Sequence, residues 1–81
     1  MIGNRIRQAR LANSLSLQEL AEALEERGYK ITRAALSKFE TGKLIPSATL
    51  IRLMAHTLGV GIGFFSWQEL PGFGIHARAP E

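Results

Sequence analysis

The sequence predicts an all-α domain of four to five short helices, and three observations support this class. Apolar residues recur at spacings of three and four along most of residues 1–67, which is the period of an amphipathic helix. Serine or threonine precedes several of these stretches and glycine follows them, as is typical of helix ends. No segment alternates apolar and polar residues as a strand does. We therefore expect one compact helical domain over residues 1–67 and an irregular tail over residues 68–81.

The first helix is predicted over residues 2–13. Ile2, Ile6 and Ala9 recur at spacings of four and three, which places them on one narrow apolar stripe. Arg10 borders that stripe, so its side chain lies at the edge of the expected core. The other arginines of this segment fall away from the stripe and should face solvent.

The second helix is predicted from Leu17 to Glu25 or Glu26. It begins at a capping box, in which Ser16 and Glu19 each satisfy a backbone N–H group at the other's position. Gly28 ends it, because glycine adopts the left-handed conformation that follows many helices without a Cβ penalty. Four apolar residues at helical spacing form its inner face: Leu17, Leu20, Ala21 and Leu24.

The third helix is predicted over residues 32–41, and its two faces differ. Thr32 is a suitable N-cap and Gly42 a suitable C-terminal stop. One face is apolar and comprises Ala35, Leu36 and Phe39. The opposite face carries two cations, a hydroxyl and a methyl group, with no carboxylate among them: Arg33, Ala34, Ser37 and Lys38. A face of this composition suits the edge of a DNA groove.

A fourth helix is predicted over residues 48–58. Ser47 is its N-cap and Gly59 ends it. The chain before Pro46 is extended, since a residue that precedes proline avoids helical dihedral angles. The main apolar stripe of this helix consists of Ile51, Met54, Ala55 and Leu58. Residues 60–67 are expected to add a short fifth helix or a turn.

The charge of the chain is small in sum but unevenly distributed. Ten lysines and arginines stand against seven acidic residues, for a net charge of +3. Basic residues gather in the first and third helices. The second helix holds most of the acids: Glu19, Glu22, Glu25 and Glu26. An excess of this size is compatible with ordinary solubility, so the distribution carries more information than the sum.

The residue inventory argues against catalysis, a metal site or a cofactor. There is no aspartate and no cysteine, and His56 and His76 are far apart without metal-binding spacing around them. The glycines do not form a phosphate-binding loop. No apolar run reaches the roughly 20 residues of a membrane-spanning helix, and no apolar stretch of a secretory signal follows the N-terminus. We expect a cytoplasmic protein that is not an enzyme and has no metal, cofactor or membrane partner.

Residues 17–41 join an apolar helix, a break and a second short helix with a cationic outer face. This arrangement is typical of a helix-turn-helix, whose second helix enters the major groove of DNA. Two amphipathic helices of an ordinary small bundle have the same periodicity. Periodicity alone therefore leaves both interpretations open.

Three segments together follow a more specific pattern. They are SLSLQELA at residues 14–21, ITRAALSKFETGK at residues 31–43 and IPSATLIRLMAHTLGV at residues 45–60. The most specific part is the run from Ser37 to Ser47. Over residues 2–66 the pattern resembles the phage-repressor/Cro-type helix-turn-helix family, also called the XRE class. The resemblance implies a lambda-repressor-like fold that binds double-stranded DNA at a pseudo-palindromic operator.

The resemblance also implies roles for individual residues. The third helix reads bases in this family, which assigns base contacts to Arg33, Ala34, Ser37 and Lys38. Phosphates are held at the start of the second helix and around the third, which assigns phosphate contacts to Leu17, Gln18, Thr32, Thr41 and Lys43. Relatives often pair an arginine of the first helix with the glutamate that ends the third. Arg10 and Glu40 are therefore expected to form a structural clamp.

The chain departs from the family pattern in three places. Leu17 stands where many relatives have glutamine, so the contact made from that position is absent unless Gln18 substitutes for it. The first helix ends at Ser14 instead of glycine, which weakens that turn slightly. Residues 25–30 lengthen the turn before the third helix by about five residues. A longer second helix or a looser turn would tilt the third helix, and the two basic residues of this insertion either contact phosphate or face solvent.

Apolar residues after the third helix exceed what one small core needs, and such surface marks a partner site. Related repressors dimerise through this region, which predicts a homodimer interface formed by Leu44, Ile45, Leu50, Leu53, Phe64 and Trp67. In a monomer the tail would instead fold back over these residues. The sequence favours a small sequence-specific transcriptional regulator, a repressor of prokaryotic or phage origin that acts at the nucleoid. The alternative is a protein-interaction module on the same scaffold, such as an antitoxin or the targeting domain of a longer protein.

Overall fold

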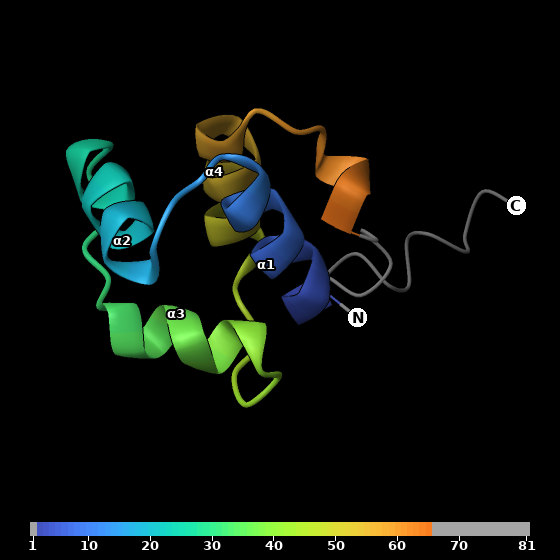
Figure 1. Ribbon diagram of the computed structural model, residues 1–81, viewed down its shortest axis with the longest axis horizontal. Helices are drawn as coiled ribbons and strands as arrows, with labels where there is room; N and C mark the ends of the chain where they lie inside the picture. Colours follow the sequence, from blue (N-terminus) through green and yellow to red (C-terminus); the bar gives the residue numbers. More distant parts are fainter. Residues whose placement is uncertain (1, 66–81) are drawn as a thin grey trace, which may run out of the picture.

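Four α-helices and one short 3₁₀ helix make up residues 2–65, the part of the chain that this computed structural model describes (Figure 1). They are α1 (Ile2–Ala12), α2 (Leu17–Glu26), α3 (Arg33–Glu40), α4 (Ala48–Leu58) and the 3₁₀ helix η1 (Ile62–Phe65). The predicted all-α class is confirmed for these residues. The predicted tail over residues 68–81 lies outside them. None of the helices described is long and apolar enough to cross a membrane.

The helices begin at the predicted capping residues. The hydroxyl groups of Ser16, Thr32 and Ser47 each accept a hydrogen bond from the backbone N–H three residues later, at 3.0, 3.1 and 3.1 Å. The Glu19 carboxylate completes the capping box by accepting from the Ser16 N–H at 2.8 Å. These caps satisfy N–H groups that have no partner inside the helix. Because Thr32 is the cap, α3 itself begins one residue later than predicted, at Arg33.

Each α-helix is followed by a residue in the left-handed region. Gly28, Gly42 and Gly59 have φ angles of 92°, 83° and 74°, as their predicted role as helix stops requires. After α1 the corresponding residue is Ser14, with a φ angle of 58°. A side chain is therefore held there in a conformation that L-residues disfavour. Helix α1 ends at Ala12, one residue before the predicted end.

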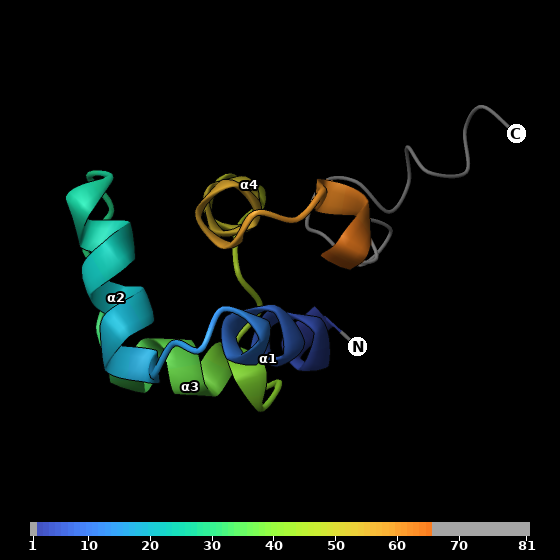
Figure 2. The same ribbon diagram turned by 45° about the horizontal axis from the view of Figure 1, so that its top comes forward.

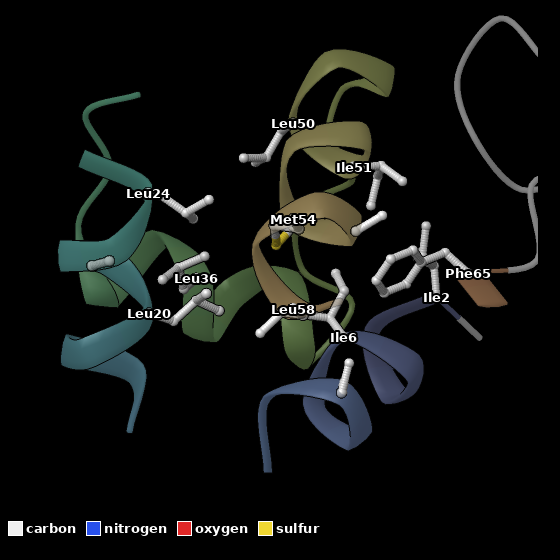
Figure 3. Close-up of a cluster of buried hydrophobic side chains, with 13 residues drawn as sticks. Ile2, Ile6, Leu20, Leu24, Leu36, Leu50, Ile51, Met54, Leu58 and Phe65 are labelled. Atoms are coloured by element: carbon white, nitrogen blue, oxygen red, sulfur yellow. The ribbon is translucent and has the colours of Figure 1, made fainter. Parts of the chain in front are cut away.

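A single apolar core among residues 2–65 draws on every helix (Figure 3). Helix α3 contributes one fully buried side chain, Leu36, which holds this helix to the core. Phe65 of η1 is also completely buried, so the short fifth helix predicted after α4 is part of the fold. Figure 3 shows the labelled side chains converging from α1, α2, α3, α4 and η1: Ile2, Ile6, Leu20, Leu24, Leu36, Leu50, Ile51, Met54, Leu58 and Phe65.

Leu50 belongs to this core, which corrects its predicted place in a dimer interface. Its side chain is 1% exposed, and it points from α4 toward Leu24 of α2 (Figure 3). The apolar arc of α4 is wider than a usual stripe because α2 packs against this second side. Leu50 therefore stabilises the fold and has almost no surface to offer to another copy.

Helices α1 and α3 approach each other very closely at Gly3. A Cβ atom at this position would lie 2.6 Å from the carbonyl oxygens of both Phe39 and Glu40, at the end of α3. Such a distance is far inside van der Waals contact, so glycine alone fits without a shift of the backbone. The first turn of α1 thereby fixes the C-terminal end of α3, which lies along the lower edge of the molecule in Figure 1.

Candidate nucleic-acid interface

Helix α3 presents a polar and cationic side to solvent. Arg33, Ala34 and Lys38 are exposed and Ser37 is half-buried. Leu36, on the opposite side, is completely buried. Within residues 2–65 no ion pair engages Arg33 or Lys38. The four residues predicted to read bases are therefore on one helix with its back held by the core, and their contacts with bases stay a prediction.

The start of α2 offers free backbone donors. The N–H groups of Ser16 and Glu19 are used in the capping box, and the N–H of Leu20 bonds to the Ser16 carbonyl at 2.9 Å. The N–H groups of Leu17 and Gln18 have no acceptor within residues 2–65. Free N–H groups at a helix N-terminus, together with the helix dipole, favour an anion. The backbone at these two predicted positions is thus suited to a phosphate.

The backbone N–H groups at the end of α3 are not free to contact phosphate as expected. The N–H groups of Thr41, Gly42 and Lys43 donate to carbonyl groups of the last turn of α3, at 3.0, 3.2 and 2.8 Å. The hydroxyl of Thr41 also donates to the Ser37 carbonyl, at 3.0 Å. These bonds close the helix. The N–H and the hydroxyl of Thr41 are both used in them, so neither is left to donate to the predicted phosphate. The exposed ammonium group of Lys43 remains available for a phosphate.

Arg10 and Glu40 lie in a nearly buried ion pair, the pair that the family resemblance implies as a clamp. Nε and Nη2 of Arg10 donate to Oε2 and Oε1 of Glu40 at 2.7 and 3.0 Å, and the two side chains are 10% and 7% exposed. Nη1 of Arg10 donates to the Leu15 carbonyl at 2.8 Å. The hydrogen bond to Glu40 raises the pKa of Arg10 above its usual value, although burial opposes this. One guanidinium group thus joins α1, the turn before α2 and the end of α3.

Arg33 and two glutamates line one hollow between α2 and α3. Glu22 and Glu25 line one side of it, and Arg33 and Ala34 line the other. The side-chain amide of Gln18 donates to Glu22 at 3.2 Å. The negative charge repels a phosphate from this place, whereas the neutral edge of a base is not repelled. The spacing of Gln18, Glu22 and Glu25 puts them on one side of α2, but the sequence does not show that α3 borders this side.

The lengthened turn is tied to the body of the protein. Helix α2 continues through Glu26, so the first two residues of the segment 25–30 are helical. The N–H groups of Gly28 and Tyr29 then bond back to carbonyls of α2, at 2.9 and 3.0 Å. Tyr29 and Ile31 pack against the core, and the two basic side chains of the turn are exposed. The start of α3 is therefore set by an anchored connection.

The other residues predicted for a dimer interface have different surroundings. Leu44 and Ile45, between α3 and α4, are 45% and 68% exposed. Leu53 and Phe64 are half-buried against the core. Trp67 lies outside the described residues. Among the predicted interface residues that the structure describes, Leu44 and Ile45 thus have the most exposed side chains.

The fold, the exposed side of α3 and the free N-terminus of α2 together define a helix-turn-helix DNA-binding protein. A family model described as helix-turn-helix matches residues 6–65. The chain belongs to the Cro/C1-type helix-turn-helix family, the XRE class, and is a regulator that binds double-stranded DNA. The expected lambda-repressor-like fold is confirmed. Comparisons with curated proteins and with solved structures gave no match.

Proposed function

We propose that this protein is a sequence-specific transcriptional repressor that binds a pseudo-palindromic operator as a homodimer, with α3 in the major groove. The observation that carries the proposal is the exposed row of Arg33, Ala34 and Lys38 on a helix whose other side is held by buried Leu36. A reading helix must keep its side chains in a fixed geometry to distinguish one base pair from another. The core and the Arg10 ion pair supply that rigidity.

Each exposed residue of α3 has its own role in this proposal. The guanidinium fork of Arg33 donates to O6 and N7 of a guanine, which is the commonest specific contact in the major groove. The methyl group of Ala34 packs against the methyl group of a thymine. Lys38 reaches a guanine or a phosphate, and the Ser37 hydroxyl contacts the edge of a base.

Phosphate contacts then fix the register of the protein on the duplex without reading its sequence. The free N–H groups of Leu17 and Gln18 hold one phosphate. The Thr32 hydroxyl accepts from the Ala35 N–H at 3.1 Å and keeps its own proton to donate to a phosphate. The exposed ammonium group of Lys43 holds another at the far end of α3.

The homodimer is proposed to form through the exposed loop residues Leu44 and Ile45. An apolar pair exposed by 45% and 68% is more stable when another copy covers it. Sedimentation at micromolar concentration tests this. We expect a dimer for the wild type and a monomer for Ile45→Glu, whereas Leu11→Glu, at a residue 55% exposed on α1, should stay dimeric. A wild-type protein that remains monomeric on DNA contradicts the dimer.

Selection of bound sequences from a random DNA pool tests specificity. We expect one enriched motif with approximate two-fold symmetry, because a two-fold dimer places the same helix on both half-sites. Affinity for the selected duplex and for an unrelated duplex is then measured across a salt series. Binding that falls steeply with salt but is equal for both duplexes is purely electrostatic and rules out the proposed regulator.

The repressor role is tested in a reporter whose promoter overlaps the selected operator. A bound dimer excludes RNA polymerase by steric hindrance, so we expect lower reporter output when the protein is expressed. The Arg33→Ala variant should restore output because it weakens operator binding. Increased output with the wild-type protein would identify an activator instead.

A further inference from the structure

A second hollow lies between the lengthened turn and α4. Its volume is about 430 Å³ and it opens widely to solvent. Arg27, Gly28 and Tyr29 form one wall from the turn after α2. The other wall is the outer side of α4 and consists of Thr49, Arg52, Leu53 and His56.

The rim of this hollow is positively charged. Arg27 and Arg52 are both exposed, and neither belongs to an ion pair within residues 2–65. No acidic side chain lines the hollow. Two guanidinium groups without a carboxylate partner, set around one concave surface, favour a ligand that brings carboxylates of its own.

The floor of the hollow is apolar and shallow. Tyr29 and Leu53 line it and are half-buried against the core. A small molecule binds well when a pocket encloses most of its surface, and a hollow this open does not do so. One large apolar side chain, presented by a protein segment that also covers the rim, fits this shape better.

The hollow lies away from the DNA-reading side. In Figure 2 the C-terminal end of α2 and helix α4 lie above α3, which runs along the bottom of the molecule. Three of the lining residues come from the turn between α2 and α3, and none of them is among the residues assigned to base or phosphate contacts. A partner seated in the hollow leaves α3 free.

We propose that this hollow docks an acidic segment of a second protein, in which one aromatic or large aliphatic residue is flanked by glutamates or aspartates. The apolar residue packs on Tyr29 and Leu53, and the flanking carboxylates pair with Arg27 and Arg52. The docked protein is thereby held on a regulator whose α3 still faces DNA. This goes beyond the proposed repressor function, which needs no second protein.

The test titrates capped pentapeptides into the full chain labelled with ¹⁵N. Binding is followed by the chemical-shift changes of the protein's amides in NMR spectra. The main probe has four glutamates around a central phenylalanine. One comparison peptide has alanine in the centre, and another has lysines in place of the glutamates. We expect the main probe to shift amides of residues 27–29 and 49–56, and to bind about tenfold more tightly than either comparison peptide.

The matched variants reverse two charges each. In Arg27→Glu/Arg52→Glu the preference should reverse, so that the lysine peptide binds better than the glutamate peptide. Arg7→Glu/Lys30→Glu makes the same change in net charge at exposed residues outside the hollow and should keep the wild-type preference. Because a preference is compared within each variant, a modest loss of stability does not imitate the expected result.

Four outcomes overturn the proposal. In one, the amide shifts spread over α3 or over the whole protein. In another, both double variants respond alike, which shows that net charge alone attracts the peptide. Benzoate alone binds as tightly as the main probe and shifts the same amides, which makes the hollow a site for small anions. The amides of the hollow move with protein concentration in the absence of peptide, which identifies a second copy of this chain as the occupant.

Discussion

The carboxylate of Glu40 accepts two hydrogen bonds from the guanidinium group of Arg10, at 2.7 and 3.0 Å. Glu40 is the last residue of α3, so this pair fixes one end of the helix that we propose reads DNA. The same end meets the backbone of α1 at Gly3. The body of α3 has only Leu36 fully buried. The orientation of α3 therefore depends on a polar pair and a close backbone contact as much as on apolar packing.

Removal of one partner of the Arg10–Glu40 pair should lower the free energy of unfolding substantially. In Arg10→Ala, Glu40 stays nearly buried without its counter-charge and the Leu15 carbonyl loses a donor, so we expect the free energy of unfolding to fall by about 3 kcal/mol. Arg7→Ala, an exposed arginine on the same helix, should change it by less than about 0.5 kcal/mol. Urea unfolding measures both. Equal losses in the two variants would contradict a structural role for the pair.

Features that depend on neighbouring residues could be predicted from the sequence. Ser16, Thr32 and Ser47 bond to N–H groups three residues ahead, and such a contact needs no knowledge of the rest of the fold. Glycine stops are equally local, since they depend on one φ angle. The Arg10–Glu40 pair is a contact between distant residues, and it was expected only because the family resemblance implies it.

Features that arise when two helices meet could not be predicted. The sequence allows Leu50 to lie on an exposed or on a buried side of α4. Its burial follows only from the side on which α2 packs. The close approach of the backbones at Gly3 depends on the position of α1 along α3. The closeness of Glu22 to Arg33 depends on the angle between α2 and α3. Periodicity gives the faces of a helix but not the neighbour of each face.

Substitution at Gly3 tests the close approach of α1 and α3. Alanine is the better helix former by about 1 kcal/mol, yet its methyl group would overlap two carbonyl oxygens of α3. We expect Gly3→Ala to lower the free energy of unfolding by about 2 kcal/mol because α1 and α3 must separate. Gly61→Ala is the control, since a Cβ there meets nothing within 4 Å. Thermal unfolding compares them, and a more stable Gly3→Ala protein would show that the two helices are not held so closely.

Ser14 offers a stabilising substitution. Its φ angle of 58° is unfavourable for a side chain, and glycine removes that penalty while adding some entropy to the unfolded chain. We expect Ser14→Gly to raise the free energy of unfolding by about 0.5–1 kcal/mol. The converse change, Gly59→Ala at a φ angle of 74° with open space around the Cβ position, should lower it by a similar amount. Both values come from denaturant unfolding; a loss of stability in Ser14→Gly would mean that the serine side chain contributes more than its backbone strain costs.

Arg33 and Lys43 should respond differently to removal of their side chains. Arg33→Ala should weaken binding to the selected operator by about 1–3 kcal/mol and relax the preference at one base pair. Lys43→Ala should weaken binding to all duplexes alike and reduce the steepness of the salt dependence by about one charge. Fluorescence anisotropy with operator, single-base variants and unrelated duplex separates the two patterns. A uniform loss in Arg33→Ala would move that residue from base reading to phosphate contact.

The carboxylates of Glu22 and Glu25, which line the same hollow as Arg33, should sharpen specificity by repelling phosphate from its guanidinium group. Glu22→Gln removes one of these charges, so we expect affinity for unrelated duplex to rise about fivefold, with a smaller gain for the operator, because a base edge was never repelled. Glu26→Gln makes the same charge change on α2 but does not line this hollow, and it should leave the ratio of the two affinities nearly unchanged. The difference between the variants should shrink at high salt, since screening weakens the repulsion. If both variants raise both affinities equally, the overall charge of the protein accounts for the effect and Glu22 has no special relation to Arg33.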